Sequence, residues 1–129
     1  DAVRVYRETF STEAPTARID KPYVMAGINV MVSDTDEEAR RQFTTIQQMF
    51  LDIRSGRQRK IQPPVDPSEF PGGVPSMLDI SAVGTPDKVA AQMAEFAERT
   101  GADELITVTY AHDPAVRNRS LELVAEEWF

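Results

Sequence analysis

The chain has 129 residues, of which 41% are hydrophobic, so it can bury the core of one compact domain, residues 1–129. Its formal net charge of −7 argues against nucleic acid or an acidic membrane surface as a partner. It has no cysteine, which excludes disulfides and thiolate metal sites and is consistent with a reducing cytoplasm. The longest apolar run, residues 23–32, is about half the length that a membrane helix needs, so no membrane partner is expected.

The first predicted element is a helix over residues 2–10, because Val3, Tyr6 and Phe10 recur at helical spacing. The chain begins with Asp1, inside this helix, so we expect it to be part of something longer.

The second predicted element is a strand over residues 23–32, whose nearly continuous apolar character is typical of a strand covered on both faces. Alternation places Asn29 and Ser33 on the face that carries the small and polar residues. That face is the better candidate for a barrel interior or a ligand cavity.

A second helix is predicted after this strand, with Asp34 and Glu37 in a capping-box arrangement and its end near Arg54. Its expected buried stripe consists of Ala39, Phe43, Ile46, Phe50 and Ile53. The segment 55–84 is irregular, and its part 55–73, rich in proline, glycine and basic residues, predicts a flexible loop. Residues 77–83 fit a short helical turn or an extended piece equally well.

A third helix is marked at both ends, by Thr85 as a side-chain cap followed by Pro86, and by Gly101 as its stop. A second strand follows over residues 105–110, and a last helix begins at Asp113. This alternation predicts a parallel α/β fold, although two strands are too few to close one.

His112, the only histidine, follows the second strand at the edge where parallel α/β folds place their active sites. Alternation, however, places it with Ile106, Val108 and Tyr110, a bulky set that is expected to pack against helices. A solvent-facing loop histidine is therefore the main alternative to a binding role.

The charged runs have similar alternatives. The acidic residues 34–38 are adjacent and point around a helix, which favours a solvated helix start over a metal site. The basic run 54–60, with Arg57 and Arg59, could clamp a phosphate or belong to a solvated loop.

Thr107 and Thr109 could line a ligand cavity, although threonine is also simply a good strand residue. Gly84 and Thr85 could bind an anion at a helix start, but a plain cap explains them. No zinc spacing, P-loop, dinucleotide fingerprint or Ser-His-Asp set occurs in the sequence, so no catalytic residue and no metal ligand is assigned.

The order of three segments carries a resemblance to a known family. PYVMAGINVMVSDTDEEARRQFTTIQQMFLDIRSG, VGTPDKVAAQMAEFAERTGADELITVTYAHDP and AVRNRSLELVAEEW together resemble the C-terminal part of luciferase-like flavin-dependent monooxygenases. The resemblance implies the last two β/α units of a (β/α)8 barrel, with about six units missing. It also implies that reduced flavin mononucleotide (FMN) or a deazaflavin oxidises a small organic substrate in the parent protein.

The resemblance suggests roles for the candidate residues. Asn29, Ser33, Thr107 and Thr109 would lie near the flavin, and Arg57, Arg59 and His112 would contact substrate or belong to a lid over the barrel mouth. Most flavin contacts would come from missing strands, so this chain alone is expected to bind no flavin and to be inactive.

Bare strand edges predict pairing between copies, so we expect a homodimer. The alternative function is a non-catalytic α/β module that binds a ligand or a partner.

Overall fold

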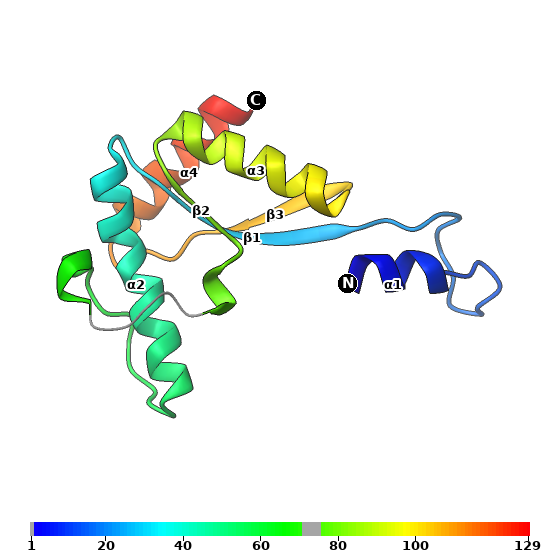
Figure 1. Ribbon diagram of the computed structural model, residues 1–129, viewed down its shortest axis with the longest axis horizontal. Helices are drawn as coiled ribbons and strands as arrows, with labels where there is room; N and C mark the ends of the chain where they lie inside the picture. The colour runs from blue at the N-terminus through cyan, green and yellow to red at the C-terminus, as the bar shows by residue number, and fades with distance from the viewer. Residues whose placement is uncertain (1, 71–75) are drawn as a thin grey trace.

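The computed structural model describes residues 2–70 and 76–129 and has a parallel sheet at its centre (Figure 1). The sheet has three strands in the order β2-β1-β3. Their bounds are Met25–Val32 for β1, Ser81–Gly84 for β2 and Glu104–Val108 for β3. β1 pairs with β3 along its N-terminal half and with β2 along its C-terminal half, and Asn29 is the residue common to both registers.

The prediction of two strands is therefore wrong by one. Residues 77–83, for which the sequence allowed either a helical turn or an extended piece, contain both, since a 3-10 turn at Ser76–Leu78 leads into β2. The four residues of β2 are too few to show a period, so their strand state depends on pairing with β1.

The helices lie close to their predicted positions. Their bounds are Ala2–Thr9 for α1, Asp36–Arg54 for α2, Pro86–Thr100 for α3 and Pro114–Trp128 for α4, and a second 3-10 turn covers Pro67–Glu69. Within the described residues no helix is long and apolar enough to cross a membrane.

Two of the predicted helix starts differ in their capping. The cap of α2 is Thr35 rather than Asp34, and its hydroxyl accepts a hydrogen bond from the Glu38 N–H at 3.2 Å. Thr85 occupies the cap position of α3, but its hydroxyl donates to Asp87 at 2.5 Å, so the predicted side-chain cap is wrong. Gly101 ends α3 in the left-handed conformation with φ 61°, which confirms the predicted stop.

Helices cover both faces of the sheet. α3 and α4 pack on the face that carries Ile28, Val30 and Val32, whereas α2 packs on Met31 through Phe43 and Ile46. The connections from β1 to β2 and from β2 to β3 run in opposite directions across the sheet, so right-handed crossovers place α2 and α3 on opposite faces.

This arrangement differs from the expected barrel segment. A barrel places consecutive strands side by side and all its helices outside, whereas here β1 lies between β2 and β3 and α2 is separated from α3 by the sheet. What the described residues establish is a parallel α/β fold.

α2 covers only one end of its face of the sheet, the end at which the strands finish. Met31 there is 1% exposed, but Met25 and Ile106, on the same face nearer the N-terminal end, are 53% and 46% exposed. We call the uncovered part, formed by Met25, Gly27, Asn29, Ile106 and Val108, the open face. Figure 1 shows α1 beyond the N-terminal end of β1, apart from the other helices, where Arg7 donates a hydrogen bond to the carbonyl of Gly101.

Candidate functional site

The open face is the first candidate site because it presents apolar side chains that no described element covers. A Cβ built on Gly27 meets nothing within 4 Å, so the space above this position is open. Asn29 lies beside Val108 at the C-terminal end of the face, and its side-chain amide donates to the carbonyl of Ile80 at 3.2 Å. The face thus offers an apolar wall with one oriented carboxamide and, beside Met25 at its N-terminal end, the exposed carboxylate of Glu104.

The two faces of β3 are the reverse of the prediction. Ile106 and Val108 were expected to pack against helices, and that expectation is wrong because both side chains lie on the open face and are exposed. Thr107 instead lies on the face of Ile28, where it lines a cavity of about 490 Å³ with residues of α3 and α4. Within the described part of the chain, the Thr109 hydroxyl oxygen is buried and has no hydrogen-bond partner.

The candidate flavin contacts are consequently not brought together. Asn29 lies on one face of the sheet and Thr107 on the other. Ser33 follows β1, is 8% exposed, and lines a cavity of about 280 Å³ between the starts of α2 and α4. His112 is exposed in the connection between β3 and α4. The binding roles of these residues stay predictions.

The start of α3 is tied to the start of α2 by Asp36. Its carboxylate accepts a hydrogen bond from the Thr85 N–H at 3.2 Å and pairs with the Lys88 ammonium. The Lys88 hydrogen bond lowers the pKa of Asp36, with desolvation acting in the opposite direction. Gly84 has φ 151°, and a Cβ there would lie 2.9 Å from an Asp36 carboxylate oxygen, so the turn requires glycine. Because a carboxylate already accepts from Thr85, this helix start is poorly suited to bind an anion.

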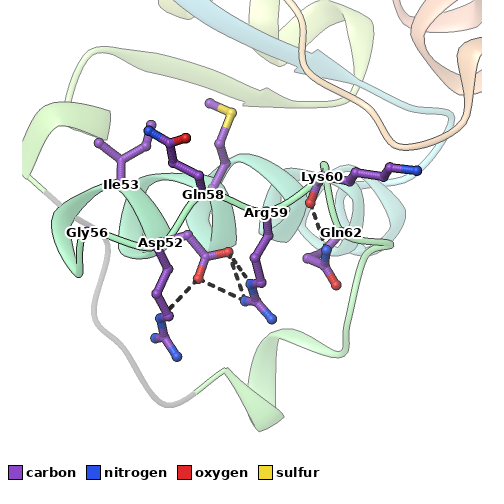
Figure 2. A pocket seen from close by; sticks show the side chains of 9 residues that line it. Asp52, Ile53, Gly56, Gln58, Arg59, Lys60 and Gln62 are labelled. Atoms are coloured by element: carbon purple, nitrogen blue, oxygen red, sulfur yellow. Dashed lines mark hydrogen bonds and ion pairs between the residues drawn. The ribbon is translucent and has the colours of Figure 1, made fainter.

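The two candidate arginines meet at Asp52, a carboxylate that the sequence analysis missed (Figure 2). Arg59 donates Nε to Asp52 Oδ2 at 2.8 Å and Nη2 to Oδ1 at 2.9 Å, and Arg57 Nε lies 3.6 Å from Oδ1. The Asp52 side chain is 7% exposed. The hydrogen bond from Arg59 is the main reason why the pKa of Asp52 is lowered, while desolvation opposes it.

Asp52 belongs to a row of polar side chains on α2 that bind the returning chain. Thr44 accepts from the Val65 N–H at 2.9 Å, and the Gln48 side-chain amide donates to the Pro63 carbonyl at 2.9 Å. The spacing of four residues places Thr44, Gln48 and Asp52 on one side of the helix. The first part of the predicted loop 55–73 therefore runs back along α2, and residues 71–73 of it, like Asp1, lie outside the described residues. The sequence does contain a signal for the Asp52 contact. Asp52 is an acid in the last turn of a helix, where the helix dipole disfavours negative charge, and a basic run follows it directly. Its neighbour Ile53 was expected in the buried stripe of α2, and that expectation is wrong because Ile53 is 62% exposed.

In residues 2–70 and 76–129 no group of three or more His, Cys, Asp or Glu could hold a metal ion.

Comparison with known proteins places these features in a family. Residues 1–104 match the family described as luciferase-like monooxygenase. A luciferase-like monooxygenase of Escherichia coli strain K12 is 33% identical over 132 residues, which is 97% of this chain and 38% of that protein. The uncharacterized protein YvbT of Bacillus subtilis strain 168 is 33% identical over 133 residues, 98% of this chain and 39% of that protein.

Among solved structures, apo-MsnO8 matches with a TM-score of 0.80 at 30% identity, over 98% of this chain and 40% of that chain. The chain thus spans about two fifths of the length of these relatives.

Proposed function

Because the chain belongs to the luciferase-like monooxygenase family, we propose that it is the C-terminal part of a flavin-dependent monooxygenase that oxidises a small organic substrate. In this proposal the parent protein is a (β/α)8 barrel, β1 and β3 are adjacent strands of its wall, and the open face is turned to its interior. α2, which packs only on the C-terminal end of that face, would then lie over the barrel mouth instead of in the outer ring of helices. A cytoplasmic location is part of the same proposal.

The observation that carries the proposal is the open face. A parallel sheet in an α/β protein is normally covered on both sides, yet Met25 and Ile106 are about half exposed. The relatives are longer than this chain, and additional barrel strands in the parent would bring side chains above this face.

The open face fits one wall of a flavin site. Its apolar side chains suit the flat ring system, and the Asn29 carboxamide could contact a polar edge of the ring. In the described part of the open face there is no cation for the flavin phosphate. We therefore propose that the phosphate and most of the ring are held by other parts of the parent, and that this chain alone is inactive.

The test is titration of FMN with the 129-residue chain and with the parent-length protein, followed by quenching of flavin fluorescence. Binding by the long form alone supports the proposal. Tight binding by the short chain would contradict the division of the site, and binding of neither FMN nor a deazaflavin by either form would favour a non-catalytic α/β ligand-binding or interaction module.

We also propose that the isolated chain forms a homodimer through its strand edges. In the described residues the outer edges of β2 and β3 have no strand partner, and such edges readily pair with another chain. Size-exclusion chromatography with light scattering should give about twice the monomer mass of 14.4 kDa, and a clean monomer would refute the dimer.

A further inference from the structure

Met25 is the member of the open face that a mild oxidant can modify. The other members, Gly27, Asn29, Ile106 and Val108, contain no sulfur. Peroxides oxidise a methionine thioether to the sulfoxide, which replaces a flexible apolar side chain with a polar one. The end of the open face at Met25 is therefore chemically different from the rest.

Two methionines of β1 lie on the same face of the sheet but differ in exposure. Met25 and Met31 are separated by an even number of positions, so their side chains point to the same side of the strand. Met25 is 53% exposed, whereas Met31 is 1% exposed because Phe43 and Ile46 of α2 pack on it. A dissolved oxidant needs access to the sulfur atom, so α2 protects Met31 and leaves Met25 open to attack.

The surroundings of Met25 leave room for the oxidised side chain. Gly27 is the next residue of β1 on this face, and nothing lies within 4 Å of a Cβ built there. Ile106, the register partner of Gly27, is 46% exposed, so water reaches this part of the face. Oxidation of Met25 therefore changes the polarity of the open face and leaves the packing of the isolated chain unchanged.

We propose that Met25 is a redox-sensitive position, at which oxidation by hydrogen peroxide lowers the affinity of the open face for the flavin ring. One peroxide oxygen is transferred to the Met25 sulfur as the O–O bond breaks, its proton moves to the other oxygen, and that oxygen leaves as water. The sulfur loses two electrons and the peroxide gains them, and methionine sulfoxide reductases reverse the change.

The effect on flavin rests on the proposed function, in which the open face is one wall of the flavin site. A sulfoxide oxygen covered by the flat ring loses its water without gaining a hydrogen-bond partner, which costs binding free energy. Hydrogen peroxide is also the product when O2 oxidises a reduced flavin in the absence of substrate, so the proposed function includes a source of the oxidant.

The first measurement is peptide mass mapping of the 129-residue chain during mild treatment with hydrogen peroxide. Met25 and the 69% exposed Met77 should be oxidised at rates within about fivefold of each other, and Met31 at least about tenfold more slowly. Circular dichroism recorded in parallel shows that the chain stays folded. Oxidation of Met25 as slow as that of Met31 would overturn the proposal.

The second measurement is quenching of FMN fluorescence by the parent-length protein, before and after the flavin-free form is treated with peroxide. Oxidation should weaken FMN binding at least about fivefold, and methionine sulfoxide reductase should restore it. Met25→Leu keeps a similar volume without the sulfur and should retain its affinity after peroxide. Met77→Leu, which removes an exposed methionine outside the open face, should lose affinity like the wild type.

The outcomes separate this inference from the proposed function. FMN binding that peroxide leaves unchanged, or that is lost equally in Met25→Leu, would overturn the inference and leave the proposed function intact. Failure of the untreated parent-length protein to bind FMN would refute the proposed function, and the inference with it.

Discussion

Thr109→Val is expected to stabilise the chain, because the Thr109 hydroxyl is buried and no group of residues 2–70 and 76–129 hydrogen-bonds to it. A buried polar group that lacks a partner costs about 1–3 kcal/mol relative to its solvated state, and valine has nearly the same shape without the hydroxyl. We therefore expect a gain of about 1 kcal/mol in the free energy of unfolding. For a chain of 129 residues this corresponds to a rise in Tm of about 4 °C.

The assay is urea and thermal unfolding followed by circular dichroism, with Thr107→Val as the control. Thr107, two residues earlier, lines a cavity, where its hydroxyl can reach water, so its replacement should change stability by less than about 0.5 kcal/mol. Thr45→Val, on α2 beyond the other face of the sheet, removes a second unpartnered hydroxyl and should add its own gain independently.

A loss of stability in Thr109→Val would refute this reasoning. It would mean that the hydroxyl has a partner, such as a buried water, and that its burial is compensated. It would also reopen the question of whether Thr109 faces a ligand rather than the helices.

Three further predictions concern Asp52, the open face and the end of α3. The pKa of Asp52 is lowered in the folded chain, so its stabilising effect is present above the unfolded pKa of about 3.9 and is lost as the pH falls through the folded value. Between about pH 5 and pH 2.5, the free energy of unfolding of the wild-type chain should therefore fall more than that of Asp52→Asn. Equal losses in urea unfolding would contradict the Arg59 contact. Gly27→Val should be neutral or stabilising by about 0.5–1 kcal/mol in this chain, because nothing lies within 4 Å of a Cβ at this position. In a parent-length protein that covers the open face, the same substitution should destabilise by about 1–3 kcal/mol. Destabilisation of the short chain would show that the face is not open. Gly101→Ala should cost about 1 kcal/mol, about as much as Gly56→Ala, because both glycines have positive φ and the group nearest a Cβ at 101 is the end of the flexible Arg7 side chain, which can move aside. A much larger cost at Gly101 would show that Arg7 is held rigidly against it.

The helices were predictable because their signals are local. α3 illustrates this: Pro86 at its first position, the apolar spacing of Val89, Met93 and Phe96, and Gly101 at its end are all readable along the chain, and the structure agrees. The cap of α4 at Asp113 was predictable for the same reason, since its carboxylate bonds the Ala115 N–H two residues away.

The faces of β3 were not predictable from residue type. The sequence suggested that the bulky side chains at 106 and 108 are buried and that the threonines at 107 and 109 are not. This inference from residue type is valid only when one face of a strand is covered by protein and the other faces water. Here the helices lie on the threonine side, and the bulky side is left uncovered within the described chain. Register with β1 decides this, and register is a property of two strands rather than one.

The contacts of Asp52 could not be predicted from local sequence either. The basic residues were recognised as a candidate, but their partner is a carboxylate on the preceding helix that becomes their neighbour only when the loop folds back along α2.

The amino-acid sequence by itself determined the helices, the two longer strands and the parallel α/β class, because capping, helical spacing and apolar runs act over a few residues. It also carried the resemblance to the luciferase-like monooxygenases, which the family match over residues 1–104 confirms. Only the tertiary structure decided the third strand, the order β2-β1-β3, the placement of α2 opposite α3, and which side chains of β3 remain exposed. These features depend on contacts between residues far apart in the chain, whose free energies no local pattern records.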